Sequence, residues 1–200
     1  IAILGNGKMG KRISELASKK GHSIVCISDS NTPAKSLDLS IADVAIDFST
    51  PTTAFENITH AINSGTPVIS GTTAWLNKLQ SINNLCIKKR GTFLYSSNFS
   101  LGVSILFELN KKLAILMKNQ NYKRKIHEIH HLQKLDAPSG TAIALKEQID
   151  EILDKKTTIT TGRINNTTGT HQITYSSEID KIEIKHTANN RDGFAMGAII

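Results

Sequence analysis

The sequence predicts an α/β protein in two parts: a Rossmann-type doubly wound parallel sheet, and a second α+β domain with an open mixed sheet. Two observations support this prediction. Short apolar runs with strand character alternate with amphipathic helical segments through residues 1–99, and each run feeds a polar or glycine-containing loop. After residue 99 the pattern changes to one long helix, followed by runs in which apolar and polar residues alternate.

The first predicted elements are a strand, a glycine loop and a helix. The apolar run at residues 1–4 is followed by a loop with three glycines and then by a helix with one apolar face. The loop glycines are Gly5, Gly7 and Gly10. A second strand, residues 23–28, ends at Asp29, nineteen residues after the last glycine of the loop. This arrangement is typical of a dinucleotide-binding unit. The alternative is a glycine turn that only lets the helix pack closely on the strand.

Two more strands are predicted at residues 44–48 and 67–70, with a helix between them that ends near Gly65. The connection across residues 30–43 is short and polar and leaves little room for a crossover helix. In a doubly wound sheet the carboxyl ends of the strands form the ligand crevice, so the loops that follow the strands are expected to line one groove. These loops are residues 48–51, 71–73 and 96–99. A capped turn into the next helix accounts for residues 71–73 equally well.

The second part begins with a long helix that carries apolar residues from Val103 to Leu116. Strands with one buried face are predicted at residues 123–129, 171–177 and 180–186. Residues 157–170 are rich in Thr, Asn and Gly and are predicted to form a loop or linker. The sequence therefore predicts a dinucleotide-binding domain, a second mixed α/β domain, and a terminal segment that packs back on the first domain. Their bounds are residues 1–99, 100–187 and 188–200.

Composition limits the classes of function. The net charge is +7, but the lysines are scattered and no basic run is interleaved with aromatic residues, so an acidic small ligand is favoured over nucleic acid. The two cysteines, Cys26 and Cys86, form neither a metal pattern nor a disulfide framework, which suits a cytoplasmic location. No apolar stretch approaches the ~20 residues of a membrane span. The chain begins inside a predicted strand and stops in an apolar run, so we expect one or both ends to be incomplete.

The most informative stretch is residues 128–142, which contains His130, His131 and Lys134 just before a helix start. Pro138, Ser139, Gly140 and Thr141 precede an apolar-periodic run, as at a helix N-terminus with free backbone N–H groups. Such an end binds carboxylate or phosphate. On a strand, adjacent histidines face opposite sides, so one can serve chemistry while the other orients. The stretch predicts a proton donor beside an anion clamp.

The same stretch also contains residue types that can bind a metal ion. On a strand, His127 and His131 face one way while Glu128 and His130 face the other, which divides the candidate ligands. We therefore expect no metal. A purely structural role for the histidine pair remains an alternative.

These motifs together resemble the dihydrodipicolinate reductase family, also called 4-hydroxy-tetrahydrodipicolinate reductase, and the resemblance runs from end to end. It rests on residues 5–10, 47–51, 71–73, 97–102, 128–142 and 182–188 together with Arg191. The resemblance implies a Rossmann cofactor domain and a substrate domain whose open sheet builds a homotetramer. It also implies hydride transfer from NADH or NADPH to a cyclic dicarboxylate imine in the diaminopimelate route to lysine.

Roles follow from the resemblance residue by residue. His130 matches the proton donor and Lys134 the catalytic, carboxylate-contacting lysine. Substrate-binding positions are matched by His131, Ser139, Gly140 and Thr141. Cofactor-binding positions are matched by Gly5, Gly7, Lys8, Met9, Gly10, Asp29, Phe48, Gly71, Thr73, Ser96, Ser97, Asn98 and Phe99.

Several positions depart from the family pattern. Ala74 stands where a glycine is usual, and Lys8 where arginine is common. Ser30 follows Asp29 where some members place an arginine for the 2′-phosphate of NADPH, so the sequence favours NADH. Lys8, Lys11 and Arg12 remain available to that phosphate. Two other functions stay open: another amino-acid or keto-acid dehydrogenase, and a non-catalytic module that senses nicotinamide nucleotides.

Overall fold

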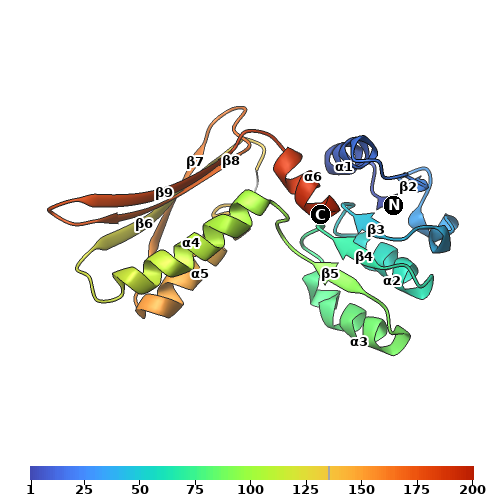
Figure 1. Cartoon of the computed structure of the whole chain (residues 1–200), viewed down its shortest axis with the longest axis horizontal. Coiled ribbons are helices and arrows are strands. Elements are labelled where there is room, and N and C mark those ends of the chain that lie inside the picture. The colour runs from blue at the N-terminus through green and yellow to red at the C-terminus, as the bar shows by residue number, and fades with distance from the viewer. Residues whose placement is uncertain (135) are drawn as a thin grey trace. The chain divides into compact units, whose positions relative to one another are not determined.

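A computed structural model describes residues 1–134 and 136–200 of the chain (Figure 1). The fold consists of two compact units. The first comprises Ile1–Ser100 and Phe194–Ile200, and the second comprises Leu101–Gly193. The first unit is therefore assembled from two stretches that lie far apart in the sequence.

The first unit is built on a parallel five-stranded sheet with the order β2-β1-β3-β4-β5. The strands are β1 (Ala2–Leu4), β2 (Cys26–Ser28), β3 (Ala45–Asp47), β4 (Val68–Ser70) and β5 (Phe93–Tyr95). The helices are α1 (Lys8–Lys19), α2 (Ala54–Asn63), α3 (Leu79–Lys89) and α6 (Asp192–Ile199), with short 3₁₀ turns at Ala34–Ser36, Leu39–Ile41 and Leu76–Lys78. All neighbouring strands pair in parallel, which confirms the predicted Rossmann-type sheet.

Alternate residues of the short strands pack against helices on opposite faces of this sheet. Leu4 lies in a cluster with Ile58 of α2 and Ile82 of α3. Its neighbour Ile3 lies in a different cluster with Ile13 of α1, which also contains Ala195 and Ala198 of α6. Because both faces are covered, the strands read as continuous apolar runs. The link after β2 contains only 3₁₀ turns, in agreement with its shortness.

The second unit has a four-stranded mixed sheet with the order β7-β6-β8-β9 and two helices. Its elements are α4 (Leu101–Met117), β6 (Lys123–His130), α5 (Gly140–Leu153), β7 (Thr158–Arg163), β8 (Gly169–Ser176) and β9 (Lys181–Ala188). The β6 and β7 strands are parallel, whereas β6 with β8 and β8 with β9 are antiparallel. Leu106 of α4 and Leu145 of α5 pack with Ile126 and Ile173 of the sheet. The predicted mixed sheet is confirmed.

The prediction for residues 157–170 was wrong in its first half. This Thr-rich segment contains β7, which pairs in parallel register with β6 from Lys125↔Thr158 to His130↔Arg163. Its composition is poor in large apolar residues because β7 is an edge strand. A parallel partner is reached only through the crossover helix α5, and such non-local pairing leaves no short-range pattern.

Among the described residues, no helix is long and apolar enough to cross a membrane.

Candidate active site

The glycine loop between β1 and α1 is held by close backbone contacts. Gly5 has a positive φ of 106°, and a Cβ added there would lie 2.5 Å from the carbonyl oxygen of Phe48. A Cβ on Gly10 would lie 1.8 Å from the carbonyl oxygen of Gly5. Both positions therefore require glycine. Gly7, by contrast, is the N-cap of α1 and faces open space, with no side-chain cap on the helix. The first backbone N–H groups of α1 can accordingly receive an anionic group.

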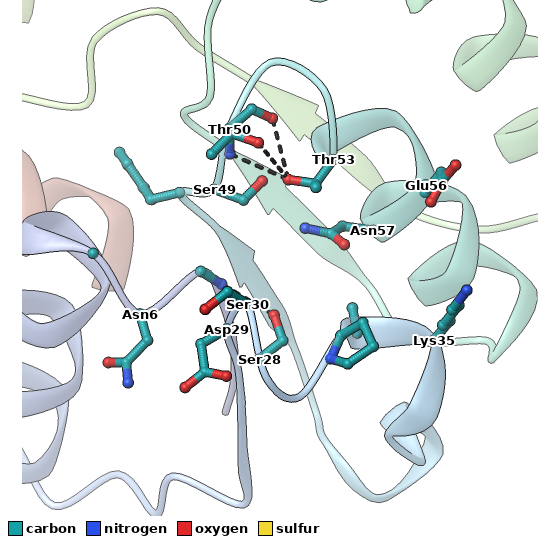
Figure 2. A pocket seen from close by; sticks show the side chains of 15 residues that line it. Asn6, Ser28, Asp29, Ser30, Lys35, Ser49, Thr50, Thr53, Glu56 and Asn57 are labelled. Atoms are coloured by element: carbon teal, nitrogen blue, oxygen red, sulfur yellow. Dashed lines mark hydrogen bonds between the residues drawn. The ribbon is translucent and has the colours of Figure 1, made fainter.

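Two adjoining pockets lie at the carboxyl ends of the strands. The larger, with a volume of about 590 Å³, is lined by Asp29, Lys35 and residues of the glycine loop (Figure 2). The smaller, of about 410 Å³, is lined by Lys8, Met9, Gly71 and Thr73 among others. Both linings contain Gly7, Phe48 and Ser49. The structure thus brings together along one groove eight predicted cofactor positions: Gly5, Gly7, Lys8, Met9, Asp29, Phe48, Gly71 and Thr73.

Asp29 directly follows β2 and begins a tight turn at the larger pocket. Its Oδ1 accepts hydrogen bonds from the backbone N–H groups of Asn31 and Thr32, both at 2.9 Å. These bonds, with Thr32 the larger cause, hold the pKa of Asp29 below its usual value. The larger pocket therefore carries a fixed negative charge where a dinucleotide-binding unit places its ribose acid.

A buried carboxylate that we did not predict as a site residue lies beneath the groove. Asp47 at the end of β3 is fully buried. Its Oδ1 accepts from Ser49 Oγ at 2.6 Å and Asn57 Nδ2 at 3.2 Å, and its Oδ2 from Ser70 Oγ at 2.8 Å and Thr72 Oγ1 at 2.7 Å. Burial raises the pKa of Asp47, and the four donors oppose that change. The carboxylate thus joins the ends of β3 and β4 to the helix α2.

The remaining predicted cofactor residues lie differently. The 96–99 loop is not in the lining of either pocket, but the Phe99 ring packs on Phe48, with centroids 5.9 Å apart. Ser96 Oγ donates to the carbonyl oxygen of Asn98 at 2.7 Å, which shapes this loop. Gly10 serves close packing of α1 and does not line a pocket. The open Gly7 N-cap and the groove on both sides of it fit a dinucleotide.

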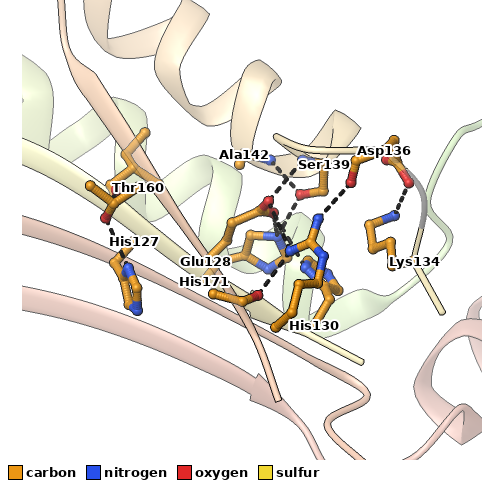
Figure 3. Close-up of polar contacts among 12 residues, drawn as sticks. His127, Glu128, His130, Lys134, Asp136, Ser139, Ala142, Thr160 and His171 are labelled. Carbon is orange, nitrogen blue, oxygen red and sulfur yellow. Dashed lines mark hydrogen bonds and ion pairs between the residues drawn. The ribbon is translucent and has the colours of Figure 1, made fainter. Parts of the chain in front are cut away.

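The second group of candidate residues surrounds the end of β6. Glu128 and His130 lie on the same face of the strand and are buried, with exposures of 0% and 7%. Strand pairing places His171 of β8 opposite Glu128, and Arg163 of β7 opposite His130. His130 Nδ1 lies 3.3 Å from Glu128 Oε2, and His171 Nε2 lies 3.7 Å from the same oxygen (Figure 3). One carboxylate therefore faces two histidines.

The start of α5 is tied to this group. Ser139 is the N-cap, and its Oγ accepts the N–H of Ala142 at 3.2 Å. The Ser139 N–H donates to Glu128 Oε1 at 3.0 Å, and the Oγ lies 3.1 Å from His171 Nε2 (Figure 3). The next residue, Gly140, faces open space. A negatively charged group can therefore approach the first turn of α5, as the sequence predicted.

The loop between β6 and α5 carries Lys134. Its Nζ lies 2.8 Å from Asp136 Oδ1, and its N–H donates to the carbonyl oxygen of His131 at 3.1 Å. Arg163 holds the same loop, because its guanidinium donates to the carbonyl oxygen of Asp136 at 2.7 Å. His131 is half-buried just after β6, and Thr141 lies in the first turn of α5. The predicted catalytic and substrate-binding residues thus come from one strand end, one loop and one helix start.

Burial governs the charge of the two buried histidines. It lowers the pKa of His130, which the negative charge of Glu128 partly opposes and which Lys134 and Arg163 lower further. Burial and the neighbouring His130 lower the pKa of His171 to about 4. A neutral His171 carries a hydrogen on one ring nitrogen only, so the tautomer decides whether Nε2 or the Ser139 hydroxyl donates in that contact.

Three residues of the β6 group could also serve as ligands of a metal ion. Ligand atoms of Glu128, His130 and His171 lie within 4.8 Å of one another. This set differs from the candidate ligands considered on the sequence, which included His127 and His131 in place of His171. In the structure His127 contacts Thr160 Oγ1 at 2.8 Å, and the third ligand comes from β8. Ser139 already engages both Glu128 and His171. The expected absence of a metal stays a prediction.

Comparison with known proteins places both units in one family. Residues 1–99 match the family model for the N-terminus of dihydrodipicolinate reductase, and residues 102–200 match the model for its C-terminus. The chain belongs to the dihydrodipicolinate reductase family. The predicted family is therefore confirmed, and with it an oxidoreductase that has a nucleotide-binding N-terminal domain.

Individual dihydrodipicolinate reductases agree with this assignment. The chain is 47% identical over 213 residues to the 4-hydroxy-tetrahydrodipicolinate reductase of Christiangramia forsetii, covering 100% of this chain and 89% of that relative. It is 34% identical to the enzyme of the same name from Thermosipho africanus, covering 96% and 84%. A dipicolinate-bound dihydrodipicolinate reductase from Paenisporosarcina sp. TG-14 shares the fold, with a TM-score of 0.73, 23% identity and coverage of 98% and 90%.

Two residues of the β6 group were missed on the sequence. Arg163 lies in the segment predicted as a loop, and His171 was predicted only as the start of a strand. Each joins the group through strand pairing, opposite His130 and Glu128 respectively. The signal available in the sequence was a charged side chain in a Thr-rich segment, at Arg163, and an imidazole at the start of a predicted strand, at His171. No rule of spacing along the chain connects these two residues to residues 128–142.

Proposed function

We propose that this reductase converts 4-hydroxy-tetrahydrodipicolinate, a cyclic imine dicarboxylate, to tetrahydrodipicolinate, and that the group at the end of β6 binds the substrate and supplies the proton. The observation that carries the proposal is the gathering of His130, Lys134 and the open start of α5 on one segment. The names of the relatives from Christiangramia forsetii and Thermosipho africanus support the same substrate.

The residues at the end of β6 bind different groups of the substrate. The first turn of α5, at Gly140 and Thr141, binds one carboxylate of the substrate through backbone N–H groups, while Ser139 shapes this helix start as its N-cap. Lys134 exchanges its contact with Asp136 for a substrate carboxylate. His131 stands beside the substrate. Together these groups offer a doubly negative ligand one full positive charge and the partial positive charge of a helix start.

His130 is assigned the proton transfer. The 4-hydroxyl group of the substrate leaves as water, which gives a second double bond in the ring. The reduced nicotinamide, when bound, would supply a hydride to this unsaturated carbon system, and the negative charge that results would be quenched by a proton. An anionic substrate beside His130 opposes the effect of burial on its pKa, so the imidazole gains a proton as the substrate binds. Glu128 and His171 face this ring from within the protein.

The groove of the first unit is assigned to NAD(P)H, with NADH preferred. Gly7, Lys8, Met9 and Gly10 form the pyrophosphate loop, and Gly71, Thr73 and residues 96–99 surround the nicotinamide. Asp29 is charged at neutral pH and would repel a 2′-phosphate at the ribose. Lys35 lines the same pocket and moderates that repulsion. Comparison of kcat/KM for NADH and NADPH tests the preference, and a higher value for NADPH would reverse it.

Assembly into a homotetramer through the open sheet is also part of the proposal. Apolar residues at and near β9 are exposed in the single chain, with Ile179 at 93% and Ile182 at 38%. Burying such residues against a second copy would remove this apolar surface from water. Light scattering on the purified protein measures the mass directly. A cytoplasmic location stays a prediction.

The decisive experiment follows the loss of reduced-nicotinamide absorbance while the substrate is generated in the cuvette by its synthase. His130→Ala and Lys134→Ala are each expected to lower kcat/KM by roughly 100-fold or more. His127→Ala is the matched control, because His127 lies on the same strand but contacts Thr160. Cofactor binding without turnover in the parent would instead favour the nicotinamide-sensing module.

A further inference from the structure

We infer that Glu128 is a positioning residue that fixes both the imidazole of His130 and the first turn of α5, so that proton transfer and anion binding are set by one buried carboxylate. The inference rests on the proposed function of His130. It concerns a residue that contacts neither the proposed ligand nor the nicotinamide.

The first support is that the two carboxylate oxygens of Glu128 face different groups. Glu128 Oε1 accepts the Ser139 N–H at 3.0 Å, at the N-cap of α5. Glu128 Oε2 faces His130 Nδ1 at 3.3 Å. Glu128 Oε2 and His130 Nδ1 are both enclosed by protein, and neither forms a hydrogen bond of ordinary geometry with any described residue. His130 Nδ1 lies nearer to Oε2 than His171 Nε2 does, at 3.3 Å against 3.7 Å, and His171 Nε2 already contacts Ser139 Oγ. In the inferred arrangement Nδ1–H therefore donates to the carboxylate.

The second support is the consequence for the other nitrogen of His130. With the hydrogen on Nδ1 directed to Glu128, Nε2 is the nitrogen left to exchange a proton with a ligand. Gly169 borders this nitrogen, because a Cβ added there would lie 3.0 Å from Nε2. Glu128 thus faces one edge of the ring, and the absence of a side chain at Gly169 leaves room at the other edge.

The third support is a chain of hydrogen bonds that reaches the helix. The Ala142 N–H donates to Ser139 Oγ, and the Ser139 hydroxyl lies 3.1 Å from His171 Nε2. His171 packs edge-on against His130, with ring centroids 5.1 Å apart, and lies opposite Glu128 in the sheet. A shift of α5 therefore changes the surroundings of His130 through Ser139 and His171 as well as through Glu128.

The charges facing His130 come from every neighbouring element. Glu128 lies on its own strand, Lys134 and Asp136 on the following loop, Arg163 on β7 and His171 on β8. Glu128 is the larger of the two acidic influences and acts to raise the His130 pKa. Replacement by glutamine removes this charge while keeping the size of the side chain. The pH at which His130 loses its proton is then expected to fall.

The test measures the titration of the His130 imidazole by NMR in the absence of substrate. The His130 signal is identified among the seven histidines by its loss in His130→Ala. In Glu128→Gln the midpoint of this titration is expected at a lower pH than in the parent. Glu183→Gln is the matched control, because Glu183 lies in the same sheet on β9 and pairs with Lys181, and it should leave the midpoint unchanged.

Turnover gives the second measurement. Glu128→Gln is expected to lower kcat by roughly 10-fold or more and to move the high-pH fall of activity in the same direction as the NMR midpoint. Added to His130→Ala, it should cause little further loss, because the two residues act as a unit. A loss of activity with an unmoved pH profile would mean that Glu128 is merely structural and would overturn the inference.

The NMR arm separates this inference from the proposed function. If the parent enzyme did not reduce the imine, the proposed function would be refuted. The shift of the His130 titration in Glu128→Gln would still test the contact between Glu128 and His130. If Glu128→Gln does not fold, Glu128→Asp withdraws the charge by one methylene and serves in its place. An unmoved midpoint in the variant that folds would overturn the inference. So would one divalent ion retained per chain and lost in His171→Ala, because Glu128 would then be a metal ligand.

Discussion

Replacing Asp47 by asparagine tests whether the buried carboxylate organises the cofactor groove. Asparagine keeps one acceptor oxygen, which is uncharged, so two of the four donors to Asp47 lose their acceptor altogether. Hydrogen bonds to charged groups contribute about 1.5–3 kcal/mol each, which gives a gross loss of about 3–6 kcal/mol. Two effects offset part of it: hydroxyls of Ser70 and Thr72 can turn to accept from the new amide, and a charge is no longer buried. We expect a net loss of about 2–4 kcal/mol.

Urea unfolding of the purified protein measures this loss of unfolding free energy, and fluorescence titration measures the affinity of the groove for NADH. Thr72 Oγ1 accepts the Ser49 N–H at 2.9 Å while donating to Asp47, so the variant should also bind NADH about 10-fold more weakly. Asp43→Asn makes the same change at an exposed position and should alter stability by less than about 0.5 kcal/mol. An Asp47→Asn protein within about 1 kcal/mol of the parent, with unchanged NADH affinity, would refute the reasoning.

Two further changes test the histidine group and the glycine loop. The unfolded chain protonates His171 near pH 6.5 but the folded chain only near pH 4, so folding should lose about 3 kcal/mol as the pH falls between these values. His171→Asn should lack this loss, and urea midpoints measured across that pH range report it; an equally steep decline in the variant would contradict the assignment. Gly10→Ala places a Cβ 1.8 Å from the Gly5 carbonyl oxygen and should cost about 2 kcal/mol or more and weaken NADH binding. In Gly91→Ala the nearest atom is 3.4 Å away, at Ile62, so thermal melting should change little, and equal effects of the two glycine variants would count against the close-contact argument.

The first unit was predictable because its signals are local. Gly5 and Gly10 are required where β1 turns into α1, and Asp29 follows at the distance that one βαβ unit imposes. The start of α5 at Ser139 was likewise readable from the residues around the N-cap. In each case the physical cause lies within about 20 residues of the pattern that reveals it.

The parts that were missed depend on pairing between distant strands. His171 reaches Glu128 only because β8 runs antiparallel to β6 in one particular register, and a slip of one residue would turn it to the other face. Arg163 reaches the β6 group through the parallel strand β7. Asp47 was visible as part of a motif, but its four partners come from β4, α2 and two loops. Spacing along the chain does not encode such contacts.

The discontinuity of the first unit has a consequence for how the protein is made. Ala195 and Ala198 of α6 complete the apolar cluster around Ile3 and Ile13, yet they are synthesised after the entire second unit. Until α6 leaves the ribosome, one face of the Rossmann sheet lacks its last covering helix. The nascent first unit therefore exposes apolar surface while the second unit folds, and chaperone binding at that stage is an expected feature of its biogenesis.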